Sequence, residues 1–154
     1  MTIFPETPAI IGRVCFHAGN QVISRVMDMT KKIVSTAKAP SALGPYNQAV
    51  IANGFVFCSG QVAINPATGE LVAGGIEEQT ERVLKNLRVV LEAAGSGLGK
   101  VVKTTVFLKN MDDFKAMNGI YATFFKENPP ARAAVEVARL PLDVQVEIEC
   151  VALV

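Results

Sequence analysis

Residues 130–149 read Pro-Ala-Arg-Ala-Ala-Val-Glu-Val-Ala-Arg-Leu-Pro-Leu-Asp-Val-Gln-Val-Glu-Ile-Glu and predict two strands separated by a turn. The second strand, over 144–153, alternates apolar and polar residues, so one of its faces is apolar. The first strand, over 131–138, begins with Arg132. Because a guanidinium fork suits a carboxylate and a strand holds it rigidly, Arg132 is the natural anchor for a small acidic metabolite. Glu147 is a candidate acid or base nearby.

The rest of the chain is periodic around this stretch. Further strands are predicted over 33–36, 48–51, 55–59 and 101–108, and helices over 76–94 and 111–126. The order is a β-rich first third followed by helix, strand, helix and two strands. It predicts an α+β fold in which both helices cover one face of a sheet.

Composition limits the classes of function. A chain of 154 residues, half of them apolar, can bury the core of one domain. The net charge of +1 leaves no basic footprint for nucleic acid. The three cysteines (Cys15, Cys58 and Cys150) and the single histidine (His17) have no metal-ligand spacing, so no metal site is predicted. No apolar run approaches the roughly 20 residues that span a bilayer.

Several motifs match one protein family in order and spacing. They include Gly44-Pro45-Tyr46, Cys58-Ser59-Gly60-Gln61, Asn65-Pro66-Ala67-Thr68-Gly69-Glu70 and the stretch 130–149. Together they resemble the RidA (YjgF) family of reactive intermediate deaminases, from about Ile33 to the C-terminus. The resemblance implies a chorismate-mutase-like fold with a mostly antiparallel sheet, assembled as a homotrimer with a site in each cleft between subunits.

The resemblance also divides the chain. Residues 29–154 are expected to form the RidA-like domain, and residues 1–28 an N-terminal extension. That extension is open to three interpretations: a disordered segment, a mitochondrial presequence, or translation from an upstream start. A cytoplasmic location is expected, or a mitochondrial one if the extension is a presequence.

The resemblance implies three chemical roles in the site. Arg132 binds the substrate carboxylate, the backbone carbonyl of Ala134 accepts a hydrogen bond from the substrate nitrogen, and Glu147 orients the attacking water. Many family members carry cysteine where this chain has Ala134, so thiol chemistry is not required. Three further residues are expected to line the same cleft: Tyr46, Phe114 and Asn118.

The implied activity is hydrolysis of 2-aminoacrylate, 2-iminopropanoate and 2-iminobutanoate to 2-oxo acids and ammonia, which protects pyridoxal-phosphate enzymes and needs no cofactor. Two alternatives stay open. One is a non-catalytic trimer that binds 2-oxo acids and regulates a partner. The other is RNA cleavage or translation inhibition, which the near-neutral charge and the single histidine disfavour.

Overall fold

The computed structural model describes residues 30–154 in full and the backbone of residues 13–18 and 21–26. The two N-terminal strands, β1 (Arg13–Ala18) and β2 (Gln21–Val26), pair antiparallel as a sheet of their own. The predicted extension over 1–28 lies largely outside the described residues. Its boundary and its role therefore stay predictions.

The other strands form one six-stranded sheet in the order β3-β4-β5-β8-β6-β7. Their bounds are β3 Lys32–Val34, β4 Ala49–Ala52, β5 Phe55–Gln61, β6 Val101–Leu108, β7 Ala131–Glu136 and β8 Val146–Leu153. All neighbouring strands are antiparallel except β6 and β7, which run parallel and are joined through a helix. This arrangement confirms the predicted α+β class and the mostly antiparallel sheet.

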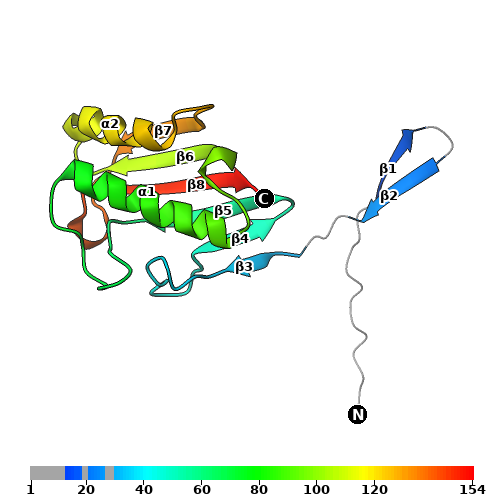
Figure 1. Cartoon of the computed structure of the whole chain (residues 1–154), viewed down its shortest axis with the longest axis horizontal. Coiled ribbons are helices and arrows are strands. Elements are labelled where there is room, and N and C mark those ends of the chain that lie inside the picture. Colours follow the sequence, from blue (N-terminus) through cyan, green and yellow to red (C-terminus); the bar gives the residue numbers. More distant parts are fainter. Residues whose placement is uncertain (1–12, 19–20, 27–29) are drawn as a thin grey trace, which may run out of the picture.

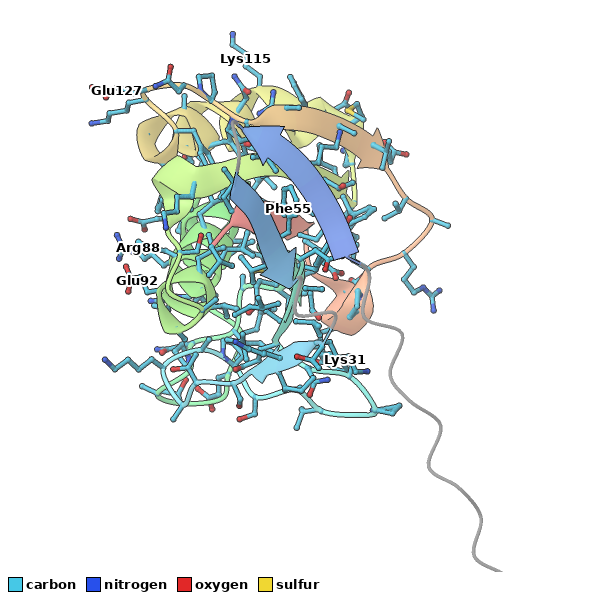
Figure 2. All side chains as sticks on the ribbon, turned by 90° about the vertical axis from the view of Figure 1, so that its right-hand side faces the viewer. Lys31, Phe55, Arg88, Glu92, Lys115 and Glu127 are labelled. Atoms are coloured by element: carbon cyan, nitrogen blue, oxygen red, sulfur yellow. The ribbon has the colours of Figure 1, made fainter. Side chains whose placement is uncertain are left out.

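Two helices, α1 (Ile76–Ala93) and α2 (Phe114–Phe124), cover one face of this sheet, as expected from the sequence (Figure 1). The inner side of α1 is apolar, and Val83, Leu84, Leu87, Val90 and Leu91 are almost completely buried. Burial of each such side chain stabilises the fold by about 1.5–3 kcal/mol. The outer side is charged, and Arg88 and Glu92 point away from the sheet (Figure 2).

The boundaries differ from the predicted ones where side chains bind the backbone. The second helix starts at Phe114 rather than at residue 111, because the Asn110 side chain accepts a hydrogen bond from the Asp112 N–H and the chain first makes a 3-10 turn over Met111–Asp113. By contrast, Asn53-Gly54 forms the predicted hairpin turn between β4 and β5. Both residues have positive φ, 50° and 80°, as a two-residue turn between twisted strands requires.

The two strands of the stretch 130–149 are not neighbours, because β6 lies between β7 and β8. A parallel pair needs a crossover, and α2 supplies it between β6 and β7. The chain then crosses to β8 through a short 3-10 turn over Pro141–Asp143. The register places Arg132 beside Thr104.

The sheet face opposite the helices carries several exposed apolar side chains, and residues 30–154 do not cover it. Exposed apolar side chains on its strands are Ile33, Phe55, Phe57, Val135 and Leu153. The Phe55 and Phe57 rings lie 6.5 Å apart, and Phe57 is 49% exposed. We call this surface the open face. Exposed apolar patches of this kind are common at contacts between protein chains.

Candidate active site

Arg132 lies on the helix side of the edge strand β7. Its guanidinium carbon is 4.6 Å from the ring centre of Tyr121 and 5.4 Å from that of Phe114, both on α2. It forms no hydrogen bond and no ion pair with any residue of the described part of the chain. Its N–H donors are therefore free to bind a carboxylate, while the ring faces hold the guanidinium plane.

The ring beneath Arg132 is itself fixed. Tyr121 is 5% exposed, and its hydroxyl shares a hydrogen bond of 2.8 Å with Oγ1 of the fully buried Thr104. Thr104 is also the register partner of Arg132 on β6. On the other side, the Phe125 ring lies 4.6 Å from the Tyr121 ring. Burial raises the pKa of Tyr121, so the phenol stays neutral.

The predicted residues Phe114 and Asn118 lie on this same side of α2, since helix positions three or four apart share a face. Phe114 is half-buried, packs on the core and contacts Arg132. Asn118 is half-buried one turn further along, and its side chain makes no hydrogen bond within the described residues. The helix therefore brings one apolar ring and one free amide to the guanidinium.

Ala134 presents its backbone at the free edge of the sheet. In a parallel pair, alternate residues direct both N–H and C=O to the neighbouring strand. The Val137 N–H donates to the Leu108 carbonyl at 3.0 Å, so odd-numbered residues of β7 face β6 and even-numbered residues face outward. The Ala134 carbonyl thus points off the edge strand, two residues beyond Arg132, and is free to accept a hydrogen bond.

Glu147 lies on the open face, over the backbone of β5. The register slips by one residue between Cys58 and Gln61, so β5 carries a bulge opposite β8. Gly60 sits in this bulge. A Cβ atom added to Gly60 would lie 1.9 Å from Oε1 of Glu147 and 2.8 Å from its Cδ. The carboxylate occupies the space that a side chain at position 60 would need.

The electrostatics of Glu147 suit a proton acceptor. Burial raises the pKa of its carboxyl group above the ordinary value, and the neighbouring carboxylate of Glu149 raises it further. Glu147 makes no ion pair with a described residue. A carboxylate whose pKa is raised toward neutrality is a stronger base than an exposed one.

Tyr46 belongs to the same neighbourhood as Glu147. Its side chain is 51% exposed in a loop, where its N–H donates to the Gly44 carbonyl at 2.9 Å. The hydroxyl of Ser59, beside Gly60, donates to the carbonyl of Asn47, beside Tyr46, at 2.6 Å. This bond ties the loop of Tyr46 to the bulge.

The predicted site residues thus form two groups on opposite faces of the sheet. Arg132 lies in register with Thr104 and Cys150, whose side chains face the helices. Glu147 is the register partner of Phe107, and its side chain lies on the open face. The Cα atoms of Arg132 and Glu147 are two strand spacings apart across the sheet and three residues apart along the strands, which together give a distance of roughly 14 Å. One small substrate cannot contact both side chains within a single chain.

Other chemistry finds little support in the described residues. They contain no group of three metal-ligating side chains, and the side chains of Cys15 and His17 lie outside them. Cys58 and Cys150 are buried opposite each other on β5 and β8. A hydrogen bond with Cys58, together with burial, raises the pKa of Cys150, so its thiol is unreactive. No helix in the described part of the chain is long and apolar enough to cross a membrane.

Sequence reasoning missed three residues that shape the site: Thr104, Tyr121 and Gly60. Thr104 and Tyr121 fit the apolar periods of their strand and helix, and nothing in the pattern distinguishes them from core residues. Gly60 carries a signal, because a glycine inside a strand pattern predicts a bulge or a close approach.

The chain is similar to known proteins over most of its length. Residues 36–154 match the protein family described as Endoribonuclease L-PSP. Human 2-iminobutanoate/2-iminopropanoate deaminase is 47% identical over 125 residues, which cover 81% of this chain and 91% of that protein. Reactive Intermediate Deaminase A, chloroplastic, from Arabidopsis thaliana is 51% identical over 122 residues, which cover 79% of this chain and 65% of that protein.

Solved structures show the same fold. The crystal structure of E. coli TdcF with bound serine superposes with a TM-score of 0.77 at 41% identity, covering 80% of this chain and 98% of that one. A RidA structure from the Antarctic bacterium Psychrobacter also superposes with a TM-score of 0.77, at 41% identity and with coverage of 80% and 99%.

Proposed function

The chain belongs to the family described as Endoribonuclease L-PSP, and because relatives 47% and 51% identical to it are named deaminases, we propose that it is a deaminase. It hydrolyses 2-imino acids, and their enamine tautomers, to 2-oxo acids and ammonia. Its substrates are 2-aminoacrylate, 2-iminopropanoate and 2-iminobutanoate. Removing these electrophiles protects pyridoxal-phosphate enzymes. The observation that carries the proposal is the stacked guanidinium of Arg132, which has no acidic partner among the described residues.

In the proposed reaction Arg132 pairs with the substrate carboxylate and fixes the C2 carbon. The Ala134 carbonyl accepts a hydrogen bond from the imine N–H and favours the protonated, more electrophilic form. Glu147 takes a proton from a water molecule as the water oxygen attacks C2, and the C=N electron pair moves to nitrogen. The proton then passes from Glu147 to that nitrogen. The C–N bond breaks as Glu147 takes the remaining hydroxyl proton, so ammonia leaves and the oxygen forms the 2-oxo group.

We propose that each site is built from two chains of a homotrimer. The separation of Arg132 and Glu147 on opposite faces supports this arrangement, since a second chain can bring its open face to the β7 edge of the first. One chain then supplies Arg132 with Ala134, Phe114 and Asn118, and its neighbour supplies Glu147 with Tyr46. The exposed rings of the open face give the apolar contact that such an assembly buries.

The experiment is a coupled assay. An amino-acid oxidase generates 2-iminopropanoate or 2-iminobutanoate, and release of ammonia and 2-oxo acid is followed with and without the protein. We expect acceleration above the uncatalysed rate. Binding of 2-oxobutanoate without acceleration would support the regulatory trimer instead, and cleavage of a single-stranded RNA substrate without imine hydrolysis would support the nuclease alternative.

The cellular compartment of the protein depends on what residues 1–28 do. We propose that the domain works in the cytoplasm, or in mitochondria if residues 1–28 act as a presequence. A fusion of residues 1–28 to a fluorescent reporter tests this, because a presequence acts independently of the domain behind it. A cytosolic, uncleaved reporter excludes the presequence.

A further inference from the structure

The guanidinium of Arg132 rests on a built support. The Tyr121 ring centre is 4.6 Å away, and the tyrosine hydroxyl is bonded at 2.8 Å to Thr104, which is the register partner of Arg132. Strand β6 therefore holds the ring against the arginine of the adjacent strand. Thr104 is fully buried and Tyr121 is 5% exposed, so neither side chain can be displaced without opening the core.

A simple core role does not explain this arrangement. An apolar residue at position 121 would fill the space without requiring a polar partner on β6, and a buried hydroxyl without a hydrogen bond is costly. Instead, the Thr104 bond fixes the ring, and Phe125 packs on its other side at 4.6 Å. The face of the ring, where its negative quadrupole lies, meets the cation.

The stacking also sets a direction. A guanidinium donates hydrogen bonds only from its edges, in its own plane. Two rings hold it, Tyr121 at 4.6 Å and Phe114 at 5.4 Å, so the place from which it donates to a carboxylate is set before the substrate arrives. An arginine without this support loses rotamer entropy each time it binds.

We infer that Tyr121 is a positioning residue for substrate recognition: its ring, fixed by Thr104, holds the Arg132 guanidinium in the orientation that binds a 2-imino acid carboxylate. The inference rests on the proposed role of Arg132 as the carboxylate anchor. On this inference, Tyr121 and Thr104 make the site bind ligands with a carboxylate more tightly than uncharged analogues of the same size.

The test measures binding of two probes, 2-oxobutanoate and its uncharged amide 2-oxobutanamide, to the full-length protein. Replacing Tyr121→Leu removes the ring, and we expect the Kd of 2-oxobutanoate to rise about tenfold while that of the amide stays within about twofold. Phe124→Leu is the matched control, because it removes a ring of the same helix that packs on the core and, among the described residues, forms no ring pair with Tyr121 and no cation–π contact with Arg132. We expect it to lower stability similarly and to leave both Kd values unchanged.

A second series keeps the shape of the site and removes the concern that Tyr121→Leu fails to fold. Phenylalanine and its increasingly fluorinated forms are placed at position 121. Fluorine withdraws charge from the ring face, so the affinity for 2-oxobutanoate should fall stepwise from Tyr121→Phe onward, while that for the amide stays constant. A purely structural role for the ring would give a flat series.

The outcomes separate the inference from the function on which it rests. If Arg132→Ala leaves 2-oxobutanoate binding intact, the proposed anchor is wrong. If Arg132→Ala abolishes binding but the fluorinated series is flat, the anchor stands and the positioning role of Tyr121 is overturned. Equal losses for the acid and the amide across the Tyr121 variants also overturn it.

Discussion

Mixing two inactive variants tests whether each site is shared between chains. Arg132→Ala lacks the carboxylate anchor and Glu147→Gln lacks the base, so each homotrimer alone should be nearly inactive. In the proposed arrangement, a site is complete when one chain supplies Arg132 and its neighbour supplies Glu147. In a mixed trimer, a Glu147→Gln chain still provides Arg132, and an Arg132→Ala chain still provides Glu147.

The magnitude follows from counting interfaces. With equal amounts and random reassembly, each position in an interface is filled by the required variant half of the time, so about one quarter of all sites regain both groups. Heterotrimers isolated with two different tags are more informative. Either composition, two chains of one variant with one of the other, restores about one of the three sites.

The assay compares imine hydrolysis after the variants are unfolded and refolded together with that after they are refolded separately and then combined. Only co-refolded samples should recover activity, at about one quarter of wild type. If Arg132 and Glu147 of the same chain formed the site, every site in every mixture would lack one group. Activity equal to the mean of the two parents would refute the shared site and the inference drawn from the opposite faces.

Four further outcomes are expected. Arg132→Lys should not restore the activity lost in Arg132→Ala, because an ammonium lacks the fork that holds a carboxylate; steady-state rates of the two variants check this. Glu147→Gln should lower the catalysed rate about 10²- to 10⁴-fold with 2-oxobutanoate binding retained, and equilibrium binding beside single-turnover rates separates the two effects. Because burial, and then the charge of Glu149, raise the pKa of Glu147, activity should fall on acidification at a higher pH than it would with an exposed carboxylate, and Glu149→Gln should move that limb of the pH–rate profile to lower pH. Gly60→Ala should displace the Glu147 carboxylate and lower kcat more than it raises KM, whereas equal kinetics would show that the close approach has no catalytic role.

The same raised pKa has a consequence for stability, with the opposite sign to that for activity. The folded state favours the protonated form of Glu147, so its contribution to stability is full below the ordinary pKa and is lost as the pH rises through the raised one. At neutral pH the buried charge therefore costs stability. Glu147→Gln should raise the melting temperature at pH 7 relative to wild type although it lowers turnover, and the difference in melting temperature should vanish at acidic pH.

Much of the fold is predictable from the chain because local signals agree with one another. The run 101–108 is β-branched and apolar and forms β6 with those bounds, and Asn53-Gly54 turns where such a pair is expected. The strand order is less accessible. Nothing local in residues 130–149 indicates that β6 inserts between the two strands of that stretch, because the insertion depends on the crossover through α2.

In the site, the face of a side chain can be predicted where a strand alternates in polarity and cannot be predicted where it does not. Strand β8 alternates Val146, Ile148 and Cys150 with carboxylates, so its sequence predicts that Glu147 leaves the core on the opposite face. Strand β7 begins Ala-Arg-Ala-Ala, which has no alternation of polarity. Which face Arg132 takes therefore cannot be predicted from the strand itself.

A side chain on a strand changes face with a shift of one residue, so the position of Arg132 depends on where β7 enters the sheet after α2. A register one residue away would place Arg132 on the open face, the same face as Glu147, and put an alanine against the helix. The observed register gives the guanidinium the rings of Tyr121 and Phe114 instead. Those contacts stabilise the register of a strand whose own side chains specify none. The two rings thus also keep Arg132 and Glu147, the proposed anchor and base, on opposite faces, and this separation is the reason that we propose a second chain in the site.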